Sequence, residues 1–475
     1  MPSTFGSPAA DVLLAAPMPR LLMIGLDCAA PKLVFERYRP WLPNLAGLME
    51  RGTWGALRST EPPITVPAWA CMLSGYDPGE LGLYGFRQRV RGSYELRLAD
   101  ASDLALPMVW DRLGAAGRRS CALFVPPSYP PRPLQGYAVS CFLTPDASHA
   151  HTYPLGLAEE LTERFGSYEP DVDDYRTEDL AGLRSALYRQ SAQRFDIAEH
   201  LLRTRKPDFL ALVDIALDRF HHAFWHHFDP DDPRHDASGP YADEGLRFYR
   251  FLDRRIGQLL AAAPSDTSVL VASDHGARPL LGGICINEWL LERGYLVLHS
   301  RPSDVTPFSK LDVDWSRTRV WAEGGYYARL CCNVRGREPT GCVAEHELPA
   351  LRAQLAAELA LLPGPHGERL AHRILLPERA YRATRGLPPD LMVFFDDLGY
   401  RSLGSVGHGS LYSAGNDTGP DGCNHDWDGV FVLAGPDITA RGPQSDLSIY
   451  DVAQTILGVF DLSDPQLLGR DRSRN

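Results

Sequence analysis

Four short apolar runs, far apart in the sequence, each adjoin a carboxylate or a histidine. They are residues 21–26 before Asp27, 208–213 before Asp214 and Asp218, 268–273 before Asp274 and His275, and 430–433 after His425. Apolar runs of this length that alternate with helical patterns are typical of strands buried in a parallel sheet. We therefore expect an α/β fold in which these polar side chains gather at one edge of the sheet, where open α/β sheets bind their ligands.

Helical periodicity fills the intervals between these runs. Helices are expected at 43–51, from about Pro67, and at 183–203, 243–263, 345–361 and 449–459. Further strands are expected at 121–125 and 136–142, and core-like strands at 391–395 and 429–433. Residues 87–180 are rich in proline and aromatic residues, which predicts an inserted lid or substrate subdomain. A second inserted subdomain is expected at 296–385. The catalytic domain would span 20–475, after an N-terminal extension at 1–19.

Composition excludes several classes of protein. The chain has 475 residues, 44% of them hydrophobic, and a net charge of −12, so it lacks the basic character of a protein that binds a nucleic-acid polymer. It contains no Gly-Lys pair, and hence no Walker-type phosphate loop. The sequence contains no run of 18 apolar residues, so no membrane span is predicted. The nine cysteines form no C-x-x-C pair, which favours reduced thiols and a cytoplasmic location.

The polar residues beside the strands suit a metal site. Carboxylates and imidazoles together bind Zn²⁺ or Mn²⁺, and a mixed set of this size can hold two ions. Asp218 and His222 are four residues apart, so on a helix they share one face. His221 would point about 100° away from His222 and is the second choice. Adjacent ligands at 274 and 275 require a turn, which Gly276 permits.

Other histidines remain open as ligands. His226 and His227 compete with His222, and His408 is an alternative ligand within the segment 404–424. That segment is rich in Gly, Ser, Asn and Asp, and we interpret it as a mobile loop that leads into His425.

Thr65 is the candidate nucleophile. It lies just before Pro67, at the expected start of a helix, where its hydroxyl could serve only as an N-cap. The same position would also let the hydroxyl attack phosphorus beside a divalent cation, while backbone N–H groups hold the anion. Ser74 lies too far inside the apolar helix to be preferred.

Taken in order, these residues resemble the alkaline phosphatase superfamily, and within it the type I phosphodiesterase and nucleotide pyrophosphatase branch, including bacterial proteins described as phosphohydrolase/phosphomutase-like. The similarity runs from about Arg20 to Leu457. It rests on Leu26-Asp27, Pro62-Pro63-Ile64-Thr65-Val66-Pro67-Ala68-Trp69, Gly75-Tyr76-Asp77-Pro78, Asp218-x-x-x-His222, Ser273-Asp274-His275-Gly276, residues 333–338, Pro389-Asp390 and His425-x-x-x-Gly429. The resemblance implies a mostly parallel central sheet flanked by helices, with inserted cap subdomains.

The resemblance also implies a ligand set and a mechanism. One divalent metal ion would be bound by Asp218, His222 and His425, and a second by Asp27, Thr65, Asp274 and His275; zinc is expected, with manganese as the alternative. Thr65 would attack in line and form a phosphothreonine, which water then hydrolyses. Cys28 departs from the family, whose members usually carry glycine after the first aspartate.

Contacts to the rest of the substrate are less defined. Arg87, Arg219 and Arg278 flank site segments and are candidate substrate contacts. Arg335 and Arg337 either hold the second subdomain on the core or contact substrate. Aromatic residues of the first insert could receive a planar leaving group; they are Tyr129, Tyr137, Phe142, Tyr153 and Tyr168.

The expected function is a metal-dependent phosphohydrolase that acts on a small-molecule phosphodiester or nucleotide pyrophosphate. A phosphoryl transferase or mutase that uses the same nucleophile is the alternative, and a non-catalytic family member is a third class. A sulfatase is disfavoured because the sequence lacks a C-x-P-x-R motif. The oligomeric state is left open, with a homo-oligomer as one option.

Overall fold

A ten-stranded sheet forms the centre of residues 20–474, the part of the chain described by this computed structural model. The strand order is β20-β2-β19-β9-β1-β8-β5-β6-β7, with β21 beside β2. The bounds are β1 Arg20–Leu26, β2 Thr53–Arg58, β5 Ser120–Leu123, β6 Gly136–Val139, β7 Thr152–Tyr153, β8 Phe209–Asp214, β9 Thr267–Ala272, β19 Asp428–Ala434, β20 Gly442–Pro443 and β21 Leu447–Ser448. The expected N-terminal extension at 1–19 lies outside the described residues.

Pairing within this sheet is mostly parallel. The five neighbours β9, β1, β8, β5 and β6 all run in the same direction, whereas β19 is antiparallel to both β2 and β9. Strands of this kind are buried on both faces, which explains their continuous apolar sequences. The predicted fold class, a mostly parallel α/β sheet flanked by helices, is confirmed.

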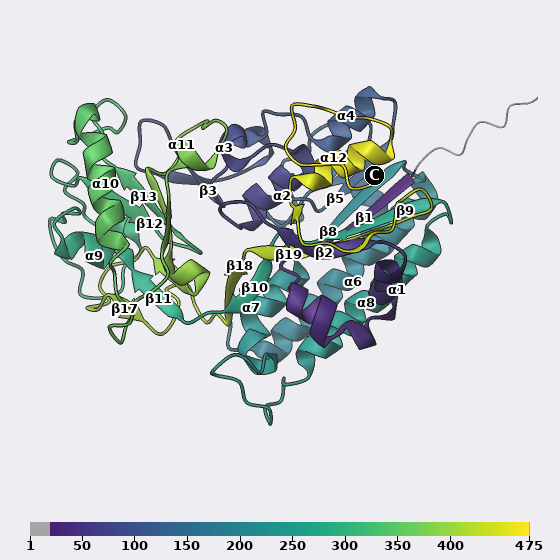
Figure 1. Cartoon of the computed structure of the whole chain (residues 1–475), viewed down its shortest axis with the longest axis horizontal. Coiled ribbons are helices and arrows are strands. Elements are labelled where there is room, and N and C mark those ends of the chain that lie inside the picture. The colour runs from purple at the N-terminus through teal and green to yellow at the C-terminus, as the bar shows by residue number, and fades with distance from the viewer. Residues whose placement is uncertain (1–19, 475) are drawn as a thin grey trace, which may run out of the picture.

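Side chains of β1 alternate between two hydrophobic cores, as the period of a strand requires. Leu22, Ile24 and Leu26 face one core, and Leu21 and Met23 face the other. Figure 1 shows the helices that cover the two faces. The first face is covered by α1 Pro43–Glu50, α6 Leu180–Arg205, α7 Ala216–Phe228 and α8 Glu244–Ala262, and the second by α2 Thr65–Ser74, α4 Val109–Ala115 and α12 Asp451–Val459.

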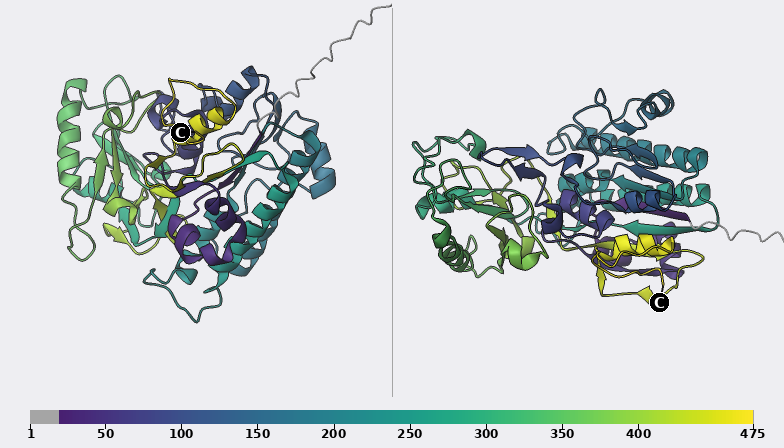
Figure 2. Two further views of the ribbon diagram at one scale, coloured as in Figure 1. Left: turned by 45° about the vertical axis from the view of Figure 1, so that its right-hand side comes forward. Right: turned by 90° about the horizontal axis from the view of Figure 1, so that it is seen from above.

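A second lobe, residues 282–413, lies to one side of this core (Figures 1 and 2). Its four-stranded sheet has the order β12-β13-β15-β14, and a three-stranded sheet has the order β16-β11-β17. Their bounds are β11 Gly282–Cys285, β12 Val320–Glu323, β13 Ala328–Cys332, β14 Arg373–Leu375, β15 Leu391–Phe394, β16 Tyr400–Leu403 and β17 Tyr412–Ser413, with helices α9 Ile286–Glu292, α10 Leu348–Leu359 and α11 Pro377–Ala380. The lobe has its own hydrophobic core.

The core and the second lobe are joined by a two-stranded ribbon. The chain leaves the core through β10 Gly276–Pro279 and returns through β18 Cys423–Asp426, and these two strands pair antiparallel. The ribbon therefore places residues near 276 and 425 beside each other, although the whole second lobe separates them in the sequence.

Two expectations about the organisation need correction. Residues 391–395 were expected to be a strand of the core, but β15 pairs with β13 and β14 in the second lobe. Residues 87–180 do not form a separate lid, because β5, β6 and β7 belong to the central sheet. These strands are short and are followed by prolines and loops, so the sequence pattern resembles an irregular insert.

The first part of the expected lid, residues 87–98, contacts the second lobe. The hairpin of β3 Arg87–Arg89 and β4 Leu96–Leu98 pairs antiparallel. Arg89 forms an ion pair with Glu338, and the Tyr94 hydroxyl donates to Asn333 Oδ1, 2.8 Å away. Two short helices, α3 Pro78–Leu81 and α5 Leu157–Phe165, complete the core.

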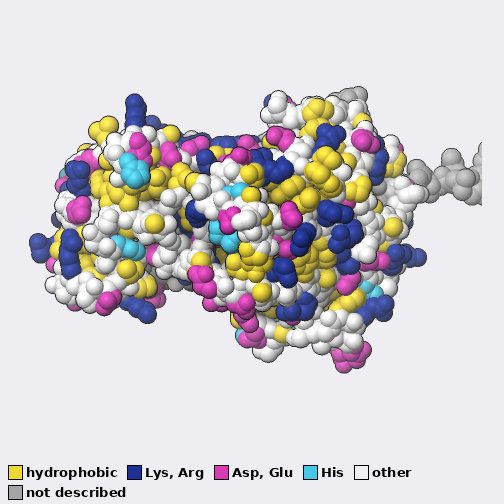
Figure 3. All heavy atoms as spheres, turned by 90° about the horizontal axis from the view of Figure 1, so that it is seen from below, with side chains coloured by type: hydrophobic (Ala, Val, Ile, Leu, Met, Phe, Trp, Pro, Cys, Tyr) yellow, Lys and Arg dark blue, Asp and Glu magenta, His cyan; other side chains and the backbone are white. Residues whose placement is uncertain are grey.

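The face of the molecule drawn in Figure 3 carries charges of both signs. Basic and acidic side chains are interspersed there over both lobes. Within residues 20–474, no helix combines the length and the apolar character needed to cross a membrane.

Candidate active site

Three parallel neighbours, β1, β8 and β9, end at the same edge of the central sheet. Asp27 directly follows β1, Asp218 lies in the first turn of α7 after β8, and Asp274 and His275 follow β9. His425 reaches the same edge from β18, through the ribbon with β10. The expected meeting of four distant segments at one edge is thus what the structure shows.

These side chains form two neighbouring groups of carboxylates and imidazoles. In the first, here called site 1, Asp218 Oδ1 lies 3.4 Å from His222 Nε2 and 3.6 Å from His425 Nε2. In the second, site 2, His275 Nε2 lies 3.6 Å from Asp27 Oδ1 and 3.2 Å from Asp274 Oδ2.

The two groups touch each other. The rings of His275 and His425 are stacked, with their centroids 3.6 Å apart, and donor atoms of Asp218, His275 and His425 lie within 4.8 Å of one another. Sites 1 and 2 are therefore neighbouring parts of one centre.

Thr65 is the first residue of α2, and Ile64 is the N-cap. In the part of the chain that the structure describes, no side chain caps this helix, so the Thr65 hydroxyl does not serve as a cap. Instead, Thr65 Oγ1 lies 3.3 Å from His275 Nε2. This places a buried hydroxyl beside site 2, at a helix N-terminus where the first backbone N–H groups have no intrahelical partners.

Unpaired polar atoms show that the donors fit metal ions. Asp27 Oδ1, Asp218 Oδ1, Asp274 Oδ2 and His425 Nε2 are all buried and have no hydrogen-bond partner among residues 20–474. They are also the atoms that face the other donors of sites 1 and 2. Leaving carboxylate oxygens unpaired in a protein interior is costly, at about several kcal/mol per ion, and divalent cations between them would remove that cost.

The carboxylates differ in their electrostatic surroundings. Burial raises the pKa of Asp27 and of Asp274 well above the ordinary range for aspartate, and neighbouring carboxylates raise it further. Burial also acts on Asp218, but the imidazoles of His222 and His425 outweigh it and hold its pKa well below the ordinary value. Without cations, site 2 is thus the group that resists full ionisation.

The imidazoles of His275 and His425 are poised to bind cations. Burial lowers the pKa of His275 well below the usual value and lowers that of His425 to about 4. Both rings are therefore neutral near pH 7, the form that binds metals. His275 Nδ1 lies 3.0 Å from the Gly276 carbonyl oxygen and His425 Nδ1 lies 2.8 Å from that of Pro63, which leaves each Nε2 facing the donor groups.

The carboxylates are oriented by contacts beneath the site. The Trp69 indole Nε1–H donates to Asp27 Oδ2 at 2.7 Å. This approach needs Gly25, because a Cβ there would lie 2.5 Å from Cη2 of Trp69. The Cys28 backbone N–H donates to Asp274 Oδ1 at 3.2 Å. Cys28 has a φ of 66°, a conformation that favours glycine, so the departure from the family pattern falls on a position with left-handed backbone.

Asp421 is a site residue that the sequence did not single out. Its Oδ1 lies 2.7 Å from His222 Nδ1. A carboxylate hydrogen-bonded to the non-ligating nitrogen of a metal-bound histidine orients the ring, and Asp421 is in the position to do this for His222. Arg176 and Arg401 both form ion pairs with Asp421. The carboxylates of Asp421 and Asp218 raise the pKa of His222 well above its usual value despite burial. Nothing in the loop composition distinguishes Asp421 from its neighbours.

Arg219 does not face an open site. It donates to Asp218 Oδ2 at 2.8 Å and to Asp171 Oδ2 at 2.7 Å. Its guanidinium lies 4.3 Å from the ring centroid of Tyr175 and 5.2 Å from that of Phe142. The structure therefore shows it bracing Asp218, a contact that sequence reasoning did not foresee.

The other candidate arginines lie at the margin of the site. Arg278 in β10 donates to the Asp397 carbonyl oxygen, and Arg87 in β3 is exposed. Of the alternative histidines, His221 lies 3.2 Å from the Tyr249 hydroxyl, and His408 lies 2.8 Å from Ser405 Oγ in the second lobe. Neither is among the metal-donor groups found within residues 20–474.

Segment 333–338 makes its contacts away from the donor groups. Arg337 forms ion pairs with Asp390 and Glu338, and Glu338 also pairs with Arg89. These contacts hold the second lobe together and attach the hairpin of β3 and β4 to it. The family-like motifs at 333–338 and Asp390 therefore have a structural role in these ion pairs.

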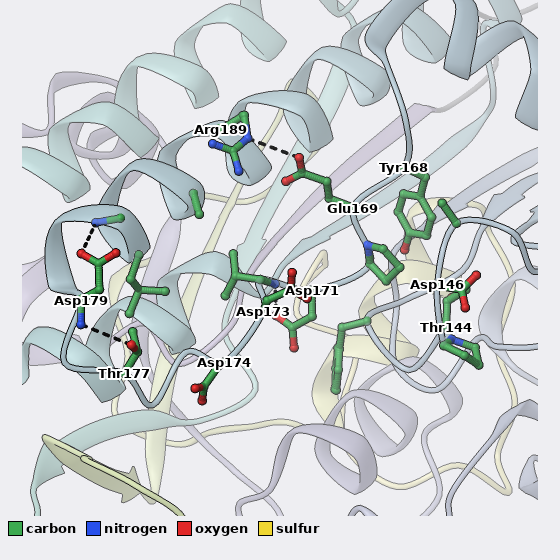
Figure 4. A pocket seen from close by; sticks show the side chains of 18 residues that line it. Thr144, Asp146, Tyr168, Glu169, Asp171, Asp173, Asp174, Thr177, Asp179 and Arg189 are labelled. Atoms are coloured by element: carbon green, nitrogen blue, oxygen red, sulfur yellow. Dashed lines mark hydrogen bonds and ion pairs between the residues drawn. The ribbon is translucent and has the colours of Figure 1, made fainter.

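A cavity of about 550 Å³ is lined in part by Asp171, the partner of Arg219 (Figure 4). Phe142 and Tyr168 form part of its wall. Six carboxylates and one arginine, Arg189, also line it; the carboxylates are Asp146, Glu169, Asp171, Asp173, Asp174 and Asp179. Such a lining would attract cations and repel anions.

The sequence model of the type I phosphodiesterase / nucleotide pyrophosphatase family matches residues 21–421. The chain belongs to this family. The match includes sites 1 and 2 except for His425, which lies just beyond it. The resemblance stated from the motifs is confirmed, and so is the enzyme class, because type I phosphodiesterases are phosphoric ester hydrolases. The family is metal-dependent, in agreement with the donor groups.

Several solved structures share this fold. Human ectonucleotide pyrophosphatase / phosphodiesterase 5 is 12% identical with a TM-score of 0.57, and 95% of this chain and 97% of that one are covered. Phosphonoacetate hydrolase from Sinorhizobium meliloti 1021, in complex with phosphonoformate, is 17% identical with a TM-score of 0.60, over 92% and 94%. No curated protein matches the chain by sequence.

Proposed function

We propose that this type I phosphodiesterase hydrolyses a small-molecule phosphodiester or nucleotide-type pyrophosphate through nucleophilic attack by Thr65 at a two-metal centre. The observation that carries the proposal is the position of the Thr65 hydroxyl, 3.3 Å from His275 Nε2, which itself lies 3.6 Å from Asp27 Oδ1 and 3.2 Å from Asp274 Oδ2. A murine relative of the same fold is described as inactive in a threonine-to-alanine form that binds AMP, which supports a threonine nucleophile.

Two divalent cations fit the donors. Asp218, His222 and His425 would hold one; Asp27, Thr65, Asp274 and His275 would hold the other. Nitrogen and oxygen donors in these numbers suit zinc, with manganese as the alternative. When bound, the cations supply Lewis acidity at the attacking and leaving oxygens of an in-line displacement.

The residues of the chain perform the remaining tasks. The Thr65 oxygen forms the bond to phosphorus as the leaving-group oxygen departs, and water then cleaves the phosphothreonine. The N–H groups of Thr65 and Val66 lie in the first turn of α2, where they can donate to a phosphoryl oxygen. Trp69 holds Asp27 and Asp421 holds His222, so two of the donors are fixed before substrate binds.

Phosphoryl transfer to an alcohol is the second candidate. Thr65 is only 1% exposed and His275 is 0% exposed, and a centre shielded in this way from water favours an acceptor other than water. Product analysis separates the two outcomes, since free phosphate or a monoester formed without an acceptor indicates hydrolysis.

A substrate screen tests the proposal. Protein of measured metal content would be assayed with bis(p-nitrophenyl) phosphate, a phosphomonoester, a nucleotide pyrophosphate, phosphonoacetate and a sulfate ester. We expect turnover of a phosphodiester or pyrophosphate that is lost in Thr65→Ala. A metal-loaded protein that turns over the sulfate ester alone, or in which Thr65→Ala remains active, would refute the proposal.

Substrate contacts, location and assembly remain predictions. Arg87 and Arg278 stay candidates for contact with substrate, and Arg219 can act on it only through Asp218 unless it leaves its present partners. The cytoplasmic location still rests on the cysteine usage, and a homo-oligomer remains an untested option.

A further inference from the structure

Tyr326 brings a hydroxyl from the second lobe to site 1. It lies in the turn between β12 and β13. Its hydroxyl oxygen, Oη, is 3.2 Å from His222 Nε2, the nitrogen that faces Asp218. The aromatic ring is stacked on that of His425, with the centroids 3.6 Å apart. Tyr326 therefore contacts two of the three candidate ligands of site 1.

Packing on both faces holds this ring in place. His425 covers one face, and the guanidinium of Arg401 lies 4.5 Å from the ring centroid. Arg401 is itself fixed by its ion pair with Asp421, and Tyr326 is only 6% exposed. The hydroxyl is thus positioned by the same network that orients His222, and it cannot turn away without breaking that network.

One distance matches the spacing of donors around one ion. Metal–ligand bonds of about 2.0–2.2 Å in a tetrahedral site separate the ligand atoms by about 3.3–3.6 Å. Tyr326 Oη lies 3.2 Å from His222 Nε2, which itself lies 3.4 Å from Asp218 Oδ1. The hydroxyl thus lies at donor spacing from one candidate ligand of site 1.

The hydroxyl also loses its partner when a cation binds. Within the described residues, its hydrogen bond is to His222 Nε2. That nitrogen would turn its lone pair to the cation, because Nδ1 of the same ring is occupied by Asp421. A buried hydroxyl left without a partner costs about 1–3 kcal/mol, and coordination through its oxygen removes that cost.

We infer that Tyr326 is a ligand of the site 1 cation, so that Asp218, His222, His425 and Tyr326 complete a four-donor site shared between the core and the second lobe. This inference rests on the proposed two-metal function. It has a consequence for substrate binding: an oxygen of the substrate would join site 1 as a fifth donor, an expansion that zinc sites allow.

Tyr326→Phe in the full chain tests the inference, with Tyr327→Phe as the matched control. Tyr327 is the adjacent buried tyrosine, but its hydroxyl donates to the Tyr84 carbonyl oxygen, away from the metal donors. Zinc affinity would be measured by competition with a fluorescent chelator. We expect two zinc ions per wild-type chain, one of them bound at least about tenfold more weakly in Tyr326→Phe, and no change in Tyr327→Phe.

Loading with Fe³⁺ provides a readout independent of activity. A tyrosine oxygen bound to Fe³⁺ produces a visible charge-transfer band, which we expect in wild type and in Tyr327→Phe but not in Tyr326→Phe. Circular dichroism spectra and melting curves would verify that the variants fold.

Two results would overturn the inference. One is equal zinc affinity of both sites in wild type and Tyr326→Phe; if turnover falls at the same time, the hydroxyl contacts substrate and not the cation. The other is an iron-loaded wild-type protein without the charge-transfer band. A wild-type chain that binds no zinc would instead refute the proposed two-metal function, so the two failures are distinguishable.

Discussion

The Thr65 hydroxyl lies 3.3 Å from Nε2 of His275. This contact joins the N-terminus of α2, on one face of the central sheet, to the loop that follows β9 at its edge. His275 in turn stacks on His425, so the candidate nucleophile, site 2 and site 1 form one continuous group. The predictions below probe the members of this group separately.

Thr65→Ala should lower turnover by about 10³-fold or more, because it removes the nucleophile, while the other donors and the fold remain. Steady-state kinetics with the best substrate of the screen measures the loss, and Thr65→Ser is the matched variant that keeps a hydroxyl. Substantial activity in Thr65→Ala would exclude Thr65 as the nucleophile.

Asp218→Ala and His425→Ala should each reduce the bound metal by about one ion per chain, because each removes a donor of site 1. Elemental analysis of the purified protein gives the count. His408→Ala is the control, since His408 contacts Ser405 in the second lobe and should leave the count unchanged. An unchanged count in Asp218→Ala would mean that site 1 is misplaced.

Asp421→Asn should lower the affinity of site 1 for its cation about 10- to 100-fold. This is the usual effect of losing a carboxylate that is hydrogen-bonded to a metal-bound histidine. Chelator competition measures the affinity. Asp417→Asn serves as the control because Asp417 accepts a hydrogen bond from Ser405 and not from a ligand. Equal affinities in the two variants would argue against a role of Asp421 in orienting His222.

Metal removal should destabilise the protein more at pH 8 than at pH 5. The pKa values of Asp27 and Asp274 are raised in the folded protein, so the metal-free fold binds more protons than the unfolded chain and loses stability as pH rises through these values. Bound cations stabilise the ionised carboxylates and reverse the effect. Melting temperatures with and without EDTA at the two pH values test this; a larger EDTA effect at pH 5 would contradict it.

Cys28→Gly should be more stable than Cys28→Ala by about 1 kcal/mol, the reverse of the usual order of glycine and alanine. The φ of 66° at this position is strained for any residue with a Cβ, by about 1–2 kcal/mol. Both variants lose the contact of the thiol with the Gly276 carbonyl oxygen. The difference between their free energies of unfolding therefore reports the backbone strain at this position. Urea denaturation measures it, and a more stable alanine variant would exclude this strain.

The strand endings were predictable because two local signals coincide in them. A buried parallel strand requires a continuous apolar run, and the polar residue that ends the run must lie at the edge of the sheet. Asp27 and Asp274 satisfy both conditions. Asp218 lies in the first turn of the helix after such a strand, and its four-residue spacing from His222 needs only a helix. Thr65 was found in the same way, from the proline that marks the start of α2.

Other assignments failed where the sequence pattern was ambiguous. The run at 391–394 is as apolar as a core strand, and only its pairing with β13 and β14 places it in the second lobe. Conversely, β5 and β6 have four residues each, too few to distinguish core strands from an insert. Asp421 and Tyr326 had no signal, because their importance lies in contacts across about 200 and 100 residues of sequence.

By itself, the sequence determined the chemistry: which carboxylates, imidazoles and hydroxyl are available, and that strands and helices present them at one edge of a sheet. The tertiary structure alone decided how they are held. It placed Asp421 behind His222, Trp69 against Asp27 and Tyr326 over His425. The physical reason is that local periodicity specifies the direction in which a side chain leaves its own strand or helix, whereas the partner it meets depends on the packing of segments that are remote in the chain.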